Sequence, residues 1–412
     1  MIAFAYFHFN NKGHFRTMLW LSKSLLLLAG SAFSLFASGL EVPENLQIHG
    51  FASQGLISTT HNNFFGPSET GVSSEYTELG VNLSYRPHPD LQFSAQAMSR
   101  RAGETDNGSI RLDYGFVGYN LISTESTQAG FFFFFFKNPL GFYNATRDIA
   151  FTRPGILLPQ SIYFDRTRNF GLSATGVQFF AERTDDSGFL SFRASIGKPS
   201  LGDKSSEYAV LGGDRPGDIS GKTSFLGRLL YEWDGDRVRL ALTHGKVNSQ
   251  YNPGSGDPFA AGNFSFSPWM LSFQYNAEKW SFTSEYALRD SAFTNFGPVL
   301  SDRSVQGESA YIQGAYRFAA GWEGLIRYDV LYQDRHDRSG ARNAALSGKP
   351  AYAYYAKDWT IGLRHDVTSS FMISGEFHSV DGTGWLPFED NLGPVSPVRR
   401  WNMFLLQGAY RF

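Results

Sequence analysis

The feature that most constrains the fold of this chain is an alternation of apolar and polar residues that recurs in about sixteen segments. Between residues 322 and 332, for example, Ile326 and Tyr328 fall on one parity, while Arg327 and Asp329 fall on the other. A period of two is typical of a β-strand, because successive side chains point to opposite faces. Each strand therefore presents an apolar face to one environment and a charged face to another, and the environment of the charged face must contain water.

The alternating segments are each close to the ~9–11 residues that a tilted strand needs to cross a bilayer. Their connections alternate between short turns and longer loops, of which 138–170 is the longest and 102–109 the shortest. This arrangement is typical of a transmembrane barrel, whose closure satisfies every backbone hydrogen bond. The sequence therefore predicts an all-β fold, a transmembrane antiparallel β-barrel of about 16 strands. The predicted strands are 46–57, 76–86, 91–101, 110–121, 128–137, 171–183, 188–198, 222–234, 237–248, 267–277, 280–290, 308–318, 321–334, 357–367, 370–380 and 402–412.

Aromatic residues on the apolar parity gather beside the short turns. A ring of aromatics at one level is typical of the interfacial girdle of a membrane barrel. The mean hydropathy of −0.26 agrees, because only one face of each barrel strand meets lipid. A soluble β-sandwich is the alternative fold, but it gives no reason for aromatics at one end. The girdle residues are Tyr85, Phe189, Tyr231, Trp233, Tyr275, Trp280, Tyr316, Phe318, Trp322, Phe371 and Tyr410.

The N-terminal region, residues 1–39, is typical of an extension followed by an export signal. Lys23 precedes an apolar run over 24–36, which has signal-peptide length and is too short to span a bilayer as a helix. Small residues at Ala37 and Gly39 predict cleavage after Gly39, so residues 40–412 form the barrel. Cleavage removes three basic residues and no acidic ones, so the formal net charge moves from −2 to −5. This balance does not indicate a nucleic-acid partner.

The last strand ends on an aromatic residue. Phe404, Leu406, Tyr410 and Phe412 occupy its apolar parity. This pattern resembles the C-terminal signal by which outer-membrane proteins reach the barrel-assembly machinery. The resemblance implies that this machinery and outer-membrane lipid are partners, and that the protein resides in the outer membrane of a Gram-negative bacterium.

The start of the longest loop carries a more specific resemblance. Lys137 is followed by Asn-Pro-Leu-Gly-Phe, and then come Arg147-Asp148 and Phe151-Thr-Arg153-Pro154. This stretch resembles the phosphate-selective (polyphosphate/phosphate) porin family over residues 137–154, and the rest of the chain resembles that family by strand pattern. The resemblance implies a passive channel that forms a homotrimer and whose long third loop folds into the lumen and forms the constriction.

Four loop arginines, at 147, 153, 166 and 168, accompany Asp148 and Asp165. Guanidinium groups in a narrow passage favour anions, because Arg stays charged and grips carboxylate or phosphate with two hydrogen bonds. Alternatively, these arginines pair with the loop acids and with wall acids, and only tether the loop. The residues expected at the pore constriction or in the lumen are Lys137, Arg147, Asp148, Arg153, Arg166, Arg168, Arg228, Arg327 and Arg364.

Six consecutive phenylalanines, Phe131 to Phe136, depart from the alternation just before this loop. Strict parity points three of the rings inward. The run either forms an apolar patch beneath the loop or marks an altered or misread segment.

The sequence offers little for catalysis. It has no cysteine, which excludes a disulfide, a thiolate zinc site and a Cys nucleophile. It contains neither an HExxH nor a GxSxG motif, so we expect no catalytic residue, metal or cofactor. His244, His365 and His378 fall near strand ends, which leaves a barrel enzyme of lipase or protease type as an alternative, beside a plugged structural barrel. The sequence favours a porin, a non-enzymatic diffusion channel for small hydrophilic solutes or ions, with anions preferred if the loop arginines face the pore.

Overall fold

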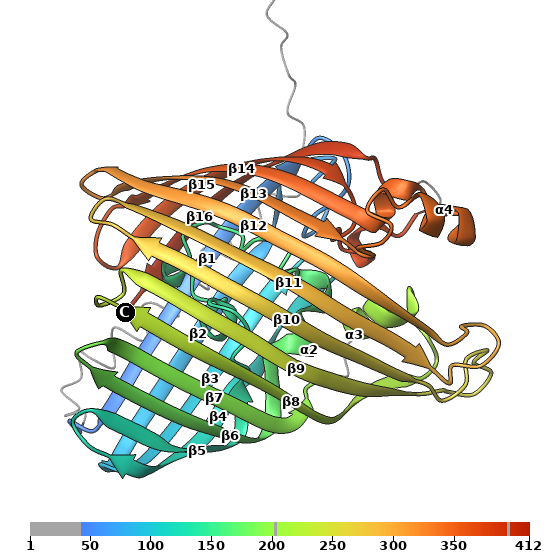
Figure 1. Ribbon diagram of the computed structural model, residues 1–412. Coiled ribbons are helices and arrows are strands. Elements are labelled where there is room, and N and C mark those ends of the chain that lie inside the picture. The colour runs from blue at the N-terminus through green and yellow to red at the C-terminus, as the bar shows by residue number, and fades with distance from the viewer. Residues whose placement is uncertain (1–42, 202–203, 394–395) are drawn as a thin grey trace, which may run out of the picture. The chain divides into compact units, whose positions relative to one another are not determined.

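The protein is described by a computed structural model that covers residues 43–201, 204–393 and 396–412. The expected signal peptide and its cleavage position lie outside the described residues. Residues Gln47–Phe412 form one compact unit, which is a closed barrel of sixteen antiparallel strands (Figure 1). The predicted barrel fold is therefore confirmed.

Each strand pairs with its neighbours in the chain, and β1 closes the barrel against β16 from Phe51↔Arg411 to Thr59↔Met403. All sixteen predicted strands are present, and many extend beyond the predicted limits at the loop end. The strands are β1 Leu46–Thr59, β2 Ser73–His88, β3 Leu91–Ala102, β4 Asp106–Ser123, β5 Thr127–Lys137, β6 Ser173–Asp185, β7 Gly188–Pro199, β8 Asp218–Trp233, β9 Val238–Asn252, β10 Asn263–Asn276, β11 Trp280–Thr294, β12 Arg303–Ala319, β13 Trp322–Tyr332, β14 Tyr355–Asp366, β15 Phe371–Gly382 and β16 Arg400–Arg411.

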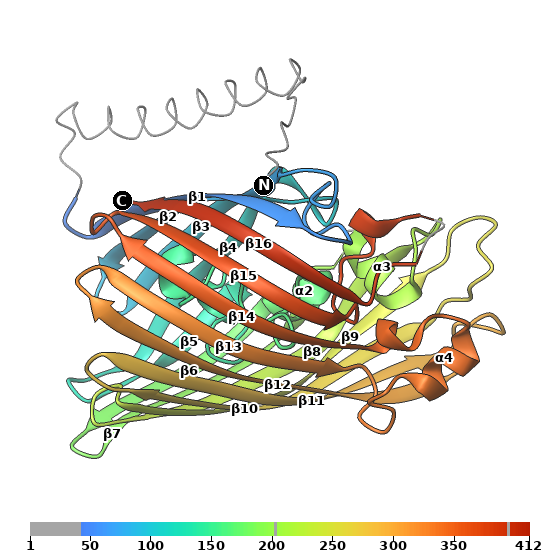
Figure 2. The same ribbon diagram turned by 90° about the horizontal axis from the view of Figure 1, so that it is seen from above.

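The connections divide the barrel into a turn end and a loop end. The turn end carries seven connections of two to four residues: 89–90, 124–126, 186–187, 234–237, 277–279, 320–321 and 367–370. The loop end carries 60–72, 103–105, 138–172, 200–217, 253–262, 295–302, 333–354 and 383–399. Figure 2 shows α4 at the loop end, away from the short turns. The short helices are η1 Asn144–Thr146, η2 Ala150–Thr152, η3 Asp165–Thr167, α2 Arg168–Leu172, α3 Lys204–Leu211, α4 Ala341–Ser347, η4 Ala351–Tyr354 and η5 Glu389–Asn391.

Two predicted boundaries are wrong. The expected loop 102–109 is a connection of three residues, 103–105, because β4 already begins at Asp106. Gly103 has a φ of +56°, a left-handed conformation that glycine adopts without a steric penalty. The expected start of a strand at residue 171 belongs instead to α2, and β6 begins at Ser173.

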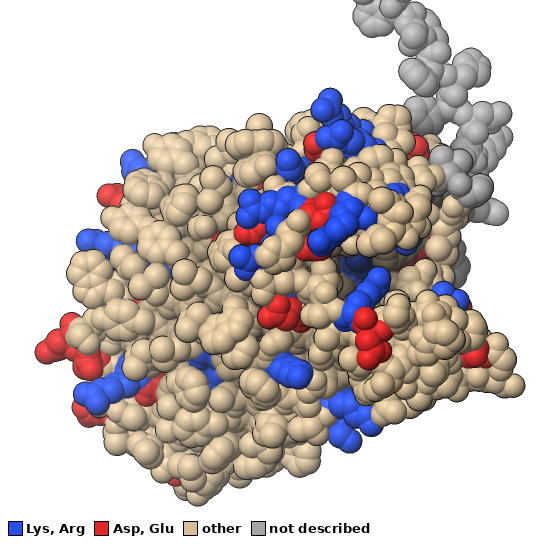
Figure 3. Space-filling view, turned by 45° about the vertical axis from the view of Figure 1, so that its right-hand side comes forward, with Lys and Arg blue, Asp and Glu red and all other residues tan. Residues whose placement is uncertain are grey.

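The outer wall is apolar, as the alternation predicts. On β8, Phe225, Leu229 and Trp233 are exposed, whereas Leu226 and Leu230 on the other parity are buried. Figure 3 shows an uncharged band of the wall, with charged side chains gathered along the turn margin and on the loop side. Such a band suits contact with hydrocarbon, because an unpaired charge there costs several kcal/mol, about 2–4 for Arg or Lys at the midplane.

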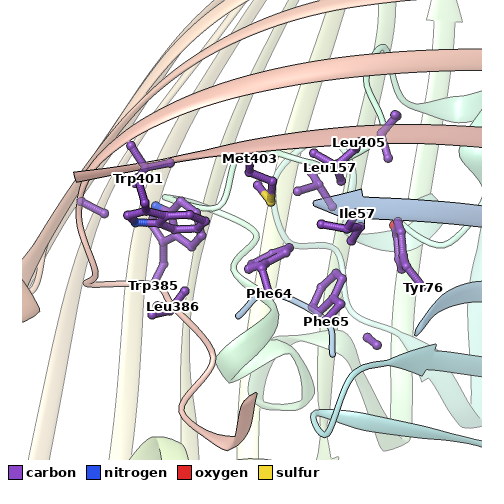
Figure 4. Close-up of a cluster of buried hydrophobic side chains, with 14 of the residues drawn as sticks. Ile57, Phe64, Phe65, Tyr76, Leu157, Trp385, Leu386, Trp401, Met403 and Leu405 are labelled. Carbon is purple, nitrogen blue, oxygen red and sulfur yellow. The ribbon is translucent and has the colours of Figure 1, made fainter. Parts of the chain in front are cut away.

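The inner face is not uniformly wet. A buried apolar cluster joins the loop end of the wall to three loops, and its side chains point toward one another in Figure 4. Phe64 and Phe65 come from the loop 60–72, Leu157 from 138–172, and Trp385 and Leu386 from 383–399. Ile156 of the loop 138–172 also belongs to the cluster, and buried residues of the strands β1 to β3 and β13 to β16 complete it: Ile57, Tyr76, Ala102, Leu331, Ala356, Val380, Trp401, Met403 and Leu405. We infer that these loops are held as one packed layer rather than as independent flexible segments.

We predict that Leu386→Ala lowers the free energy of unfolding by about 2–5 kcal/mol, because it leaves a cavity in this cluster. Leu386 is 3% exposed, whereas Leu346 on α4 is 81% exposed. The matched control Leu346→Ala is expected to change stability by less than about 0.5 kcal/mol. Urea titration of both variants, refolded in lipid vesicles, measures the difference, and equal effects would contradict the packed layer.

Candidate functional site

The loop 138–172, between β5 and β6, is closed at its base by one side chain. The amide nitrogen of Asn144 donates hydrogen bonds to the carbonyl oxygens of Asn138 (2.9 Å) and Gly171 (3.0 Å). Asn144 is buried, so these contacts satisfy polar groups that have no access to water. The two ends of a loop of this length are therefore fixed side by side.

Carboxylates on the inward face of the wall accept hydrogen bonds from the backbone of this loop. Glu376 of β15 accepts from the backbone N–H groups of Ile156 (2.9 Å) and Leu157 (3.1 Å). Asp329 of β13 accepts from the N–H of Ser161 (3.1 Å). On β11, Glu285 accepts from the N–H of Phe142 (3.1 Å). Hydrogen bonds to a charged acceptor are stronger than neutral ones, so these acids hold the loop at separate points along its length.

Arginines of the wall bind the carbonyl groups of the same loop. Arg327 of β13 donates to the carbonyl of Leu157 (3.0 Å), and Arg289 of β11 donates to that of Ser161 (3.1 Å). Arg228 of β8 donates to the carbonyl of Gly141 (2.8 Å). The loop backbone is thus held through both its donors and its acceptors by side chains of the inward parity.

Most of the predicted site cations are paired with carboxylates. Lys137 contacts Asp113, and Arg168 contacts Asp148. Further pairs join Arg153 to Glu78 (2.7 Å), Arg147 to Asp165 (3.5 Å), and Arg364 to Asp366 (2.8 Å). Arg147, Arg153 and Arg168 are at most 6% exposed. These contacts favour the tether alternative for the loop arginines, and their role in selecting a solute stays a prediction.

The electrostatics of the loop follow from this burial. Burial raises the pKa of Asp148, but Arg168 and Lys137 outweigh that effect and hold this pKa far below its ordinary value. Asp165 behaves alike: burial raises its pKa, and Arg100 and Arg147 bring it below the ordinary value. Burial lowers the pKa of Arg147 to about 10, with Arg168 adding repulsion. Burial likewise lowers the pKa of Arg166 to about 10.

Three predicted site cations have no carboxylate within the 4.0 Å ion-pair limit among the described residues. The guanidinium of Arg166 lies over the ring of Phe388, 4.2 Å from its centroid. Arg327 is 1% exposed and is held by Leu157 and by the hydroxyl of Thr360 (3.2 Å). Arg228 is half-buried, and its guanidinium donates to the carbonyl of Gly141.

The phenylalanine run is both a patch and an irregular segment. Phe132 stacks on Phe180 of β6 with ring centroids 4.6 Å apart, and it also contacts Phe116 of β4. Phe136 is buried. Phe134 leaves the strict alternation, since it has a φ of +87° and is 62% exposed.

The three histidines considered for an enzyme site have structural partners. His244 stacks on Trp269 and His365 stacks on Trp322. His378 is fully buried, with Nδ1 2.7 Å from Asp358 and Nε2 3.2 Å from Glu376. It does not lie at an exposed rim. Within the described ranges, no cluster of three or more His, Asp or Glu side chains is arranged to hold a metal ion.

Sequence reasoning did not assign the wall acids to the site. Glu78, Glu285, Asp329 and Glu376 contact the loop, and Asp113 contacts Lys137 at the end of β5. All five fall on the inward parity of their strands, and this was the signal that could have found them. Their partners were not predictable, because they are largely backbone groups and side chains of a loop without periodicity.

Sequence comparisons find no match for this chain, whereas comparison of its fold with solved structures finds some. No family model matches the sequence, and it has no match among curated proteins. Among the described residues no helix is long and apolar enough to cross a membrane. The barrel has the fold of Gram-negative outer-membrane porins.

Three solved structures illustrate the likeness. The outer membrane channel DcaP of Acinetobacter baumannii is 12% identical with a TM-score of 0.57, covering 89% of this chain and 97% of that one. An anion-selective porin from Comamonas acidovorans is 11% identical with a TM-score of 0.52, covering 89% and 99%. The outer membrane protein OmpT of Vibrio cholerae, in its trimer form, is 11% identical with a TM-score of 0.51, covering 89% and 99%. At these identities the likeness concerns the fold.

We predict that Asp148→Asn destabilises the folded protein by about 3–5 kcal/mol, because it leaves the buried cation of Arg168 without its carboxylate. The matched control is Asp185→Asn, since Asp185 lies in an exposed hairpin and pairs with an exposed arginine; an exposed pair contributes about 0–1 kcal/mol. Urea titration in vesicles compares the two variants. A loss for Asp148→Asn no larger than that of its control would contradict the tether.

The lowered pKa values of Asp148 and Asp165 also set a pH window. A carboxylate with a depressed pKa in the folded protein stabilises it above the ordinary pKa, and this contribution is lost as pH falls through the folded value. The contribution of both residues should therefore be constant from pH 7 to about 5 and should decline only below about pH 4. Urea midpoints measured from pH 7 to pH 3 test this. In Asp148→Asn the urea midpoint should fall less between pH 7 and pH 3 than it does in the unchanged protein.

Proposed function

We propose that this chain is a porin of the Gram-negative outer membrane, which lets small hydrophilic solutes or ions diffuse passively through its lumen. The observation that carries the proposal is the closed barrel whose outward parity is apolar and whose inward parity is charged. A backbone that crosses lipid must satisfy its hydrogen bonds internally, and a closed barrel does so. Lipid outside and a polar interior are the conditions that such a barrel fits.

The loop 138–172 is our candidate for the constriction. Its hydrogen bonds to inward residues of β8, β11, β13 and β15 support this assignment. Because the loop is fixed at so many points, we expect it to narrow the lumen by a constant amount and not to move in and out of the lumen. We therefore expect a narrow channel whose conductance saturates with solute concentration.

Anion preference and phosphate specificity are the finer parts of the proposal. The likeness in fold to an anion-selective porin and the cations of the inward face support a preference for anions. Phosphate specificity rests only on the resemblance of residues 137–154. The paired state of Arg147, Arg153 and Arg168 weighs against a role for these three in phosphate binding.

Assembly follows the same reasoning. We propose a homotrimer, supported by the trimer form solved for the similar Vibrio cholerae protein. Phe404, Leu406 and Tyr410 are exposed on the outward face of β16, and Phe412 follows them, as expected of a signal for the barrel-assembly machinery. The export signal in residues 1–39 belongs to the same proposal.

The rival functions make different demands. A barrel enzyme needs a solvent-accessible nucleophile or acid–base pair, and the Asp358–His378 pair is fully buried, so we propose that the protein is not an enzyme. A plugged structural barrel is favoured by the packed layer of loops. It differs from a porin in a single property, the absence of conductance.

We predict that the purified, refolded protein forms channels in a planar lipid bilayer, with a reversal potential in a KCl gradient that favours chloride over potassium. The physical reason is the positive field of the least neutralised cations along the inward face. A reversal potential that favours cations would contradict the anion preference. Absence of conductance in vesicles that contain folded barrel would contradict the channel itself and favour a plugged barrel.

A further inference from the structure

The loop arginines are largely engaged with other groups of the protein, which leaves the wall residues to contribute charge to the lumen. Of the predicted site cations, most are paired with acids, Arg166 lies over the ring of Phe388, and Arg327 is too buried to be reached. Arg228 of β8 remains half-buried with no carboxylate within 4.0 Å among the described residues. Among the described residues, the guanidinium of Arg228 makes one hydrogen bond, which it donates to the carbonyl of Gly141. A guanidinium has five N–H donors, so most of its capacity is free for a ligand.

A second arginine lies directly across the ladder from the first. The register of β7 and β8 places Arg193 opposite Arg228, an arrangement of like charges that destabilises a strand pair. Arg193 pairs with Glu182 (2.9 Å), but its Nε is buried with no hydrogen-bond partner. Of these two neighbouring arginines only Arg193 is paired with a carboxylate, so the pair carries an excess of positive charge.

The same part of the wall presents an aromatic surface. The stacked rings of Phe132 and Phe180 line a cavity of about 170 Å³ at the turn end of the barrel, together with Arg193. The guanidinium of Arg193 lies 6.0 Å from the centre of the Phe132 ring. The remaining lining residues are Arg86, Pro89, Asp90, Gln92, Gly118, Asn120, Gln128 and Glu182.

The residues that line this cavity suit a ligand with a negative charge and a flat apolar group. Its acids, Asp90 and Glu182, are matched by Arg86 and Arg193, so the adjacent Arg228 gives the region its positive balance. Apolar rings on an otherwise polar face bind a flat apolar group favourably, because aromatic pairs attract one another beyond the area that they bury. An enclosed cavity of about 150 Å³ accommodates one benzene ring, so a single ring fits this space of about 170 Å³.

We propose that this cavity and the adjacent Arg228 form a subsite for small anions that carry a planar ring, of which a monocyclic aromatic carboxylate is the simplest. The ring lies against Phe132 and Phe180, and the carboxylate faces Arg193 and Arg228. The inference rests on the proposed channel function and names a class of solute for it. An inorganic anion such as phosphate lacks the group that the phenylalanines would bind.

The test uses the purified full-length protein in a planar bilayer in KCl, with sodium benzoate or sodium acetate as the blocking ion. We expect benzoate to reduce the current at a concentration about fivefold or more below that of acetate, the difference that aromatic contact supplies. Phe132→Leu should raise the half-blocking concentration of benzoate about two- to tenfold and leave that of acetate unchanged. Arg228→Gln should weaken the effect of both anions.

Matched variants control for general effects. Phe131 lies on the opposite parity of the same strand, against Phe179, so Phe131→Leu should leave the benzoate effect unchanged. Arg183 is an exposed arginine at the turn end, so Arg183→Gln is the corresponding control for Arg228. Phe180→Leu repeats the ring deletion on β6, in case Phe132→Leu does not fold.

Two results would overturn the subsite: equal half-blocking concentrations for benzoate and acetate, or an unchanged benzoate effect in both ring variants. Failure of the channel function looks different, because no current flows at all. In that case titration calorimetry of the folded protein in detergent, with benzoate and acetate, decides the subsite by itself. Preferential benzoate binding that Phe132→Leu weakens supports it, and the absence of such binding refutes it.

Discussion

The structure depends on one constraint, that hydrocarbon offers no hydrogen-bond partner to a peptide group. A sheet that crosses lipid must therefore close on itself, and β1 pairs with β16 to do so. Closure gives every strand an outer and an inner face, and apolar and polar side chains alternate along the strand accordingly. Trp322 and Ile326 are exposed on the outer parity of β13, whereas Arg327 and Asp329 are buried on the inner one.

The inside of the barrel then creates a second requirement. Charged side chains that leave water need partners, and the loop 138–172 supplies many of them. Glu376 binds two of its N–H groups, Arg327 binds one of its carbonyls, and Glu78 pairs with its Arg153. The loop and wall satisfy one another, so neither is fixed without the other. Arg193 keeps a buried Nε without a partner among the described residues, and we propose that it and Arg228 leave capacity for a solute.

The sequence predicted the strands of the barrel wall well, because lipid on one face and water on the other require apolar and polar residues to alternate along each strand. It predicted the loop less well. Pairing of the loop arginines with Asp148, Asp165 and wall acids was one of two alternatives, but which acid each of Arg147, Arg153 and Arg168 binds depends on distances that no local pattern encodes. The break at Phe134, with its positive φ, and the early start of β4 at Asp106 also depend on tertiary contacts. The apolar layer around Trp385 escaped prediction because its members come from distant loops.

The central claim is that odd and even side chains of each strand face two different solvents. The chain has no cysteine, so single cysteines can be placed through residues 322–332 and 225–233 and labelled with a nitroxide. The measurement is the accessibility of each label to oxygen, which is concentrated in lipid, in the protein refolded in vesicles. We predict that accessibility rises and falls with a period of two, with maxima at the outward positions such as Ile326 and Leu229. A profile without this period, or one with a helical period, would contradict the account.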